Sequence, residues 1–120
     1  MFGFLSRLLP SSQSDQISAD EFIAGLAAGT HRLVDVRERG EYAAGHLAGA
    51  VSMPLSRFDP SRLPAAADGR VVVMCLSGAR SARAAAAASR AGRTDVVNFG
   101  GSLRDLVAAG GRIVTGSDSR

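Results

Sequence analysis

The 120-residue sequence has no tryptophan, no lysine, one tyrosine and a single cysteine. One cysteine excludes an internal disulfide, so an apolar core must hold the fold, and a thiol that stays reduced indicates a cytoplasmic protein. No apolar run is long enough to cross a membrane, and no repeat is present. Hydrophobic residues make up 46% of the chain, which is enough for the core of one domain.

All fourteen positive side chains are arginines, spread from Arg7 to Arg120 among eleven acids, and the net charge is +3. The pI near 10.4 therefore reflects arginine's high pKa rather than a high charge density. Because no basic tract is interleaved with aromatic residues, no nucleic-acid partner is expected. The two histidines and the cysteine lack the ligand spacing of zinc sites, so we predict no metal and no cofactor.

Hydrophobic patterning predicts short strands that alternate with helices, which indicates a parallel α/β sheet. Helices are expected at 18–29, 38–44, 80–90 and 102–109, and strands at 32–36, 50–54, 70–75 and 96–99. Residues 55–64 are expected to form a loop with a helical turn. We predict a short amphipathic arm and linker at 1–15, one domain at 16–115 and a disordered tail at 116–120.

The candidate site is Cys75, which ends the most apolar predicted strand, Arg70-Val71-Val72-Val73-Met74-Cys75. The loop from Cys75 to Arg80 leads into a helix, so backbone N–H groups and the helix dipole would meet the sulfur there. Such surroundings stabilise a thiolate. A cysteine that ends a valine run is also a common core residue, and spacing alone leaves both interpretations open. Ser77 and Ser81 are expected to cap the following helix.

Three further polar residues are interpreted as structural. His46 lies in a Gly-His-Leu setting, where a hydrogen bond is more common than catalysis. Glu38 and Glu41 are three residues apart on a short predicted helix, a spacing typical of a capping interaction or a solvated face.

Several segments resemble the rhodanese-like domain family. Leu33 to Glu38, Glu41-Tyr42 and Gly45 to Pro54 are similar to its two early motifs. The segment VVVMCLSGARSARAA is similar to its active-site strand, loop and helix, and Val97 to Gly101 to its closing motif. The resemblance implies a three-layer fold, with a central, mostly parallel five-stranded sheet and helices on both faces.

The resemblance also implies a function. Cys75 would be the catalytic nucleophile that carries a sulfane sulfur as a persulfide, and Asp35 would support the site from a neighbouring strand end. Substrate-binding roles would fall to Leu76, Ser77, Gly78, Ala79, Arg80, Ser81 and Arg37. The donor would be a small anion such as thiosulfate, and the acceptor cyanide, a thiol or a sulfur-carrier protein.

Four residues separate Cys75 from Arg80, one fewer than in the related dual-specificity phosphatases, and a smaller amide ring suits one sulfur atom better than phosphate. The alternative to an enzyme is a non-catalytic or carrier module that acts by binding another protein. A monomer or weak homodimer is expected in either case.

Overall fold

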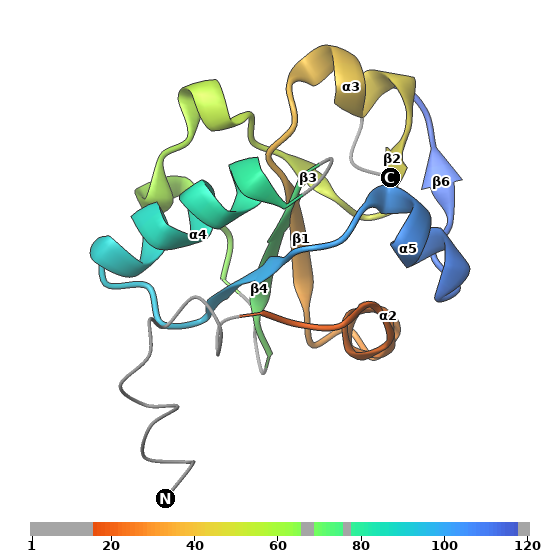
Figure 1. Ribbon diagram of the computed structural model, residues 1–120, viewed down its shortest axis with the longest axis horizontal. Coiled ribbons are helices and arrows are strands. Elements are labelled where there is room, and N and C mark those ends of the chain that lie inside the picture. The colour runs from red at the N-terminus through yellow and green to blue at the C-terminus, as the bar shows by residue number, and fades with distance from the viewer. Residues whose placement is uncertain (1–15, 66–68, 76–77, 118–120) are drawn as a thin grey trace, which may run out of the picture.

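The computed structural model describes residues 16–65, 69–75 and 78–117, and Figure 1 shows the arrangement of its elements. The expected arm at 1–15, and residues 118–120 of the expected tail, lie outside these ranges. In chain order the elements are α2 (Ala19–Ala27), β1 (Arg32–Asp35), α3 (Arg39–Ala44), β2 (His46–Leu47), β3 (Val51–Ser52), the 3-10 turns η2 (Leu55–Arg57) and η3 (Pro60–Arg62), β4 (Val71–Met74), α4 (Ala79–Arg90), β5 (Val96–Phe99), α5 (Leu103–Ala108) and β6 (Ile113–Val114).

The main sheet is parallel and has the strand order β3-β1-β4-β5. The parallel α/β prediction is therefore confirmed, but in the described residues the main sheet has four strands rather than five. A single parallel bridge between Gln16 and Asn98 stands at the fifth position, beside β5. Pairing stops there because Ser18, two residues later, already accepts a hydrogen bond from Glu21 N–H and caps α2.

The sheet separates two apolar clusters, as its pleat requires. Val71 and Val73 of β4 belong to the cluster beneath α4, whereas Val72 and Met74 belong to the cluster beneath α2 and α5. Alternate side chains of a strand point to opposite faces, so the unbroken apolar run of β4 fills both clusters. Figure 1 shows α4 on one side of the sheet and α2 and α5 on the other, which gives the predicted three layers.

Helix α4 packs closely on the sheet because its inward positions carry small side chains. Ser81, Ala84 and Ala88 are fully buried, and their spacing of three and four residues places them on one face of the helix. Alanine has the highest helix propensity, so the same residues favour the helix and allow a short distance to β4.

A second, antiparallel sheet joins β2 to β6, where His46 pairs with Val114 and Leu47 with Ile113. The sequence did not predict this pair, because two residues are too few to show an alternating pattern. The pairing brings the last described segment against α3, where Gly116 N–H donates to the Ala43 carbonyl at 2.9 Å.

Candidate active site

Cys75 follows β4 directly, and its side chain points to the α4 face of the sheet. It belongs to the cluster that contains Val73 and Ala84, and it is 0% exposed. The prediction that β4 delivers this residue to the carboxyl edge of the sheet is confirmed. Burial alone would also fit a core cysteine, so the polar groups around the sulfur decide what the site can do.

A backbone N–H group of the described residues points at this sulfur. Gly78 N–H donates to Cys75 Sγ at 3.0 Å. Gly78 is the N-cap of α4 and has φ +95°, in the left-handed region that glycine adopts at no steric cost. The Gly100 carbonyl also approaches so closely that a Cβ at position 78 would lie 2.6 Å from its oxygen. Glycine at 78 therefore lets the chain turn and aim its N–H group at the thiol.

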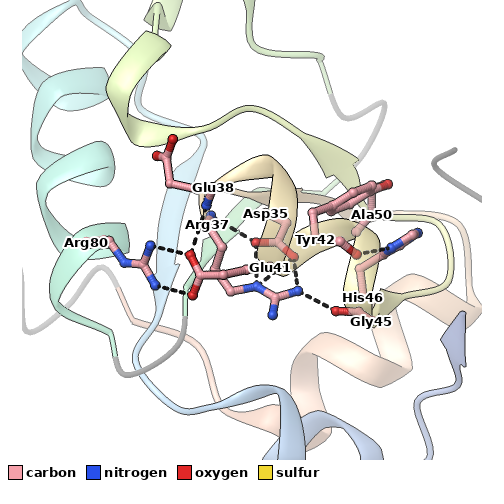
Figure 2. A network of polar contacts seen from close by, with 9 residues as sticks. All are labelled: Asp35, Arg37, Glu38, Glu41, Tyr42, Gly45, His46, Ala50 and Arg80. Carbon is pink, nitrogen blue, oxygen red and sulfur yellow. Dashed lines mark hydrogen bonds and ion pairs between the residues drawn. The ribbon is translucent and has the colours of Figure 1, made fainter. Parts of the chain in front are cut away.

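Arg80, in the first turn of α4, makes a two-pronged ion pair with Glu41 of α3, at 2.7 and 2.9 Å (Figure 2). The hydrogen bonds from Arg80 are the largest cause that lowers the pKa of Glu41 from 4.5 to about 2. The pKa of Arg80 is raised, mainly by the hydrogen bond to Glu41 and in smaller part by the charge of Cys75. An acid therefore holds the Arg80 guanidinium, and negative charge on Cys75 would favour its positive charge further.

Asp35 and Arg37 form a second, buried pair beside the first. Arg37 Nη2 lies 2.7 Å from Asp35 Oδ2, and the same nitrogen donates to the Gly45 carbonyl at 2.7 Å (Figure 2). Asp35 is 0% and Arg37 5% exposed. Each charge depends on the other, since a buried charge without a partner is costly. This geometry favours a supporting role for both residues, and donor binding by Arg37 stays a prediction.

The predicted site residues are only partly described. Gly78 and Arg80 lie near Cys75, whereas Leu76 and Ser77 lie outside the described residues. Ala79 begins α4 and is exposed. The expectation that Ser81 caps the helix is wrong: its hydroxyl donates to the Gly78 carbonyl at 3.1 Å, and the N-cap position of α4 is Gly78, which has no side chain. A buried hydroxyl inside the helix finds its nearest acceptor one turn back.

Reasoning from the sequence missed two contacts in this region. Glu41 was expected to be structural, and its side chain accepts a hydrogen bond from the Glu38 N–H. Its ion pair with Arg80 was not predicted, because the two residues are 39 positions apart in the sequence. Tyr42 and His46 stack with ring centroids 3.6 Å apart. His46 Nδ1 lies 2.8 Å from the Tyr42 carbonyl oxygen, as expected of a structural histidine. Their spacing of four residues was the one signal available for this pair.

The part of the chain that the structure describes contains neither a cluster of metal-ligating side chains nor a helix that could span a membrane. No three side chains of the metal-ligating types gather in one place there. Likewise, no helix in the described ranges has both the length and the apolar character needed to cross a bilayer.

A buried cysteine lies at the carboxyl end of a central parallel strand, and the helix that follows begins beside the sulfur. This is the arrangement by which an α/β domain can stabilise an anion at the edge of its sheet. A sequence model described as the rhodanese-like domain matches residues 18–109. The chain therefore belongs to the rhodanese-like domain family, as the resemblance of its motifs predicted.

Relatives of this chain include sulfurtransferases. Human thiosulfate:glutathione sulfurtransferase is 31% identical, over 74% of this chain and 90% of the human protein. The solved structure of a human single-domain sulfurtransferase superposes with a TM-score of 0.70 at 31% identity, and the match covers 78% of this chain and 96% of that one. An uncharacterized Synechocystis protein is 40% identical over 65% of this chain, which spans 44% of that protein's length.

Proposed function

We propose that the protein is a sulfurtransferase that carries a sulfane sulfur on Cys75 as a persulfide. The observation that supports this most directly is the Gly78 N–H donated to Cys75 Sγ at 3.0 Å. Core packing does not require a backbone donor on a cysteine, and a donor there stabilises negative charge on sulfur. Relatives that include a thiosulfate:glutathione sulfurtransferase support the same reaction class.

The proposed reaction has two displacement steps. The Cys75 thiolate attacks the sulfane sulfur of thiosulfate, an S–S bond forms, and the bond to the SO₃ group breaks with its electron pair, so that sulfite leaves. The enzyme then holds Cys–S–S⁻. An acceptor thiolate, or cyanide, attacks the outer sulfur and restores the Cys75 thiolate. No net oxidant is needed, because the transferred sulfur keeps its oxidation state.

Three groups have assigned roles in this proposal. The Gly78 N–H holds the anionic sulfur, and the amino end of α4 adds positive potential in the same direction. Arg80 attracts the anionic donor, with a strength that its pairing with Glu41 moderates. Asp35 and Arg37 hold the carboxyl end of β1 in place, because Arg37 donates both to the Asp35 carboxylate and to the Gly45 carbonyl.

Intact-mass measurement tests the proposal. After incubation with thiosulfate the protein should gain about 32 Da, the mass of one sulfur atom, and dithiothreitol should remove it. Cys75→Ser serves as the control and should gain nothing. If neither thiosulfate nor glutathione persulfide produces the adduct, the enzyme proposal fails and the non-catalytic module remains.

A further inference from the structure

A groove runs along the edge strand β3. Two adjoining hollows, of about 280 and 220 Å³, share Arg39 and Ser52 in their linings. The smaller hollow is also lined by Arg57 of η2 and Arg62 of η3. We call the two hollows together the arginine groove. A water molecule takes up about 30 Å³ in the liquid, so the groove is too large for one small oxyanion.

The charge of the groove is not neutralised locally. In residues 16–65, 69–75 and 78–117, ion pairs hold Arg37, Arg80 and Arg93, but none of the three groove arginines. Among the described residues, Asp59 is the one acid that lines the smaller hollow.

The Asp59 carboxylate is already engaged by a neighbour. It accepts from Ser61 N–H at 3.0 Å and from Ser61 Oγ at 2.7 Å. These hydrogen bonds, more than the charge of Arg62, lower the pKa of Asp59. Three guanidinium groups against one occupied carboxylate leave the groove with an excess of positive charge.

The outer edge of β3 favours an extended occupant. Met53 N–H donates to the Asp35 carbonyl of β1, and alternate residues of a parallel strand bond to opposite sides, so the peptide groups of Ser52 point away from β1. An extended peptide recognises this kind of sheet edge.

Helix α3 contributes a residue to the groove and another to the candidate active site. Arg39 lines the groove, and Glu41, two residues later on another side of the helix, reaches Arg80 near Cys75. Because Arg80 is not among the described residues that line the groove, a ligand there would not compete with the donor for Arg80.

We propose that the arginine groove docks an extended acidic peptide segment of the protein that exchanges sulfur with Cys75. This inference rests on the proposed function and names the partner class. A concave groove beside a strand edge suits a single extended chain, whereas a membrane surface would need a convex or flat basic face. Carboxylate side chains pair with arginine through two parallel hydrogen bonds, which gives the groove its selectivity.

The first experiment measures binding of fluorescein-labelled hexaglutamate to the full chain by fluorescence anisotropy. Arg57→Glu with Arg62→Glu should raise the dissociation constant at least about ten-fold, since reversed charges repel the peptide. Arg104→Glu with Arg112→Glu makes the same change in net charge at exposed positions elsewhere and should change it by less than about two-fold. Arg57→Gln with Arg62→Gln replaces the reversal variant if circular dichroism shows that the latter is unfolded.

Three results would overturn the docking inference. Equal weakening in both reversal variants would mean that the attraction is spread over the surface. Displacement of the peptide by an equal concentration of inorganic phosphate would mean that the groove takes one anion only. Phosphatidylserine vesicles that bind the wild type but not the groove variant, while hexaglutamate binds neither, would assign the groove to a membrane.

The second experiment links docking to sulfur exchange. Peptides that end in cysteine, one with six glutamates and one with six glutamines, would receive sulfur from the Cys75 persulfide. The acidic peptide should react at least about ten-fold faster than the glutamine peptide. Arg57→Glu with Arg62→Glu should abolish this difference in rate. Equal rates would overturn the inference. If thiosulfate adds mass to the protein but peptide binding does not depend on the groove arginines, the docking inference alone fails. If the peptide binds but no persulfide forms, the proposed function fails.

Discussion

Replacing Gly78 with alanine tests whether backbone geometry at the start of α4 supports the thiol. Position 78 has φ +95°, which costs an L-residue about 1–2 kcal/mol. The new Cβ would also lie 2.6 Å from the Gly100 carbonyl oxygen, and both partners are backbone, so one of two loops must move. Together these effects should lower the free energy of unfolding by about 2–4 kcal/mol.

A matched control lies at the other end of the same helix. Gly92 has φ +91°, but a Cβ there would meet nothing within 4 Å. Gly92→Ala should therefore lose only the conformational part, about 1–2 kcal/mol. The difference between the two variants, measured by urea unfolding, isolates the close approach of Gly78 to Gly100.

Thiol reactivity supplies a second readout. If Gly78 N–H holds the sulfur, moving it should slow the gain of mass from thiosulfate at least about ten-fold, because one hydrogen bond to a charged group contributes about 1.5–3 kcal/mol. Gly92→Ala should react at the wild-type rate. Equal destabilisation by the two substitutions, or an unchanged rate in Gly78→Ala, would refute the reasoning.

Two further predictions concern the ion pairs of Figure 2. Arg37→Met should lower the free energy of unfolding by about 3–5 kcal/mol in urea, because it leaves the fully buried Asp35 carboxylate without its guanidinium; a loss below about 1 kcal/mol would contradict this. The pKa of Glu41 is lowered from 4.5 to about 2, so its stabilising effect should be complete above pH 4.5 and disappear as the pH falls to about 2. Because the Glu41 side chain is 36% exposed, we expect this effect to stay below about 1 kcal/mol, and Glu41→Gln should remove it from the pH dependence of urea unfolding. A wild type and variant with parallel stability curves from pH 6 to about 2 would contradict the assignment.

The sequence predicted the elements of the main sheet because each one carries a strong local signal. The apolar run of β4 indicated burial on both faces, and Val71 to Met74 indeed contribute to both clusters. Ser18 and Glu21 form the capping box expected at the start of α2. In these segments local preference and tertiary packing agree, which is when reasoning from sequence succeeds.

The features that sequence reasoning missed depend on contacts between distant segments. The pairing of β2 with β6 joins His46 to Val114, and neither strand is long enough to be recognised alone. The partner of Arg80 could not be chosen among eleven acids without knowing that the fold brings Glu41 of α3 within reach of the first turn of α4. The grouping of Arg39, Arg57 and Arg62 likewise requires the fold, because the sequence shows only arginines spread evenly along the chain.

The strand order β3-β1-β4-β5 constrains how the chain can be made and divided. The central neighbours β1 and β4 pair residues such as Arg32 and Val71, so the middle of the sheet forms only after a long loop has closed. A nascent chain that ends before β4 has just the two-residue contact of β1 with β3. The protein should therefore fold late in synthesis and in one step, and neither half should be stable when expressed separately.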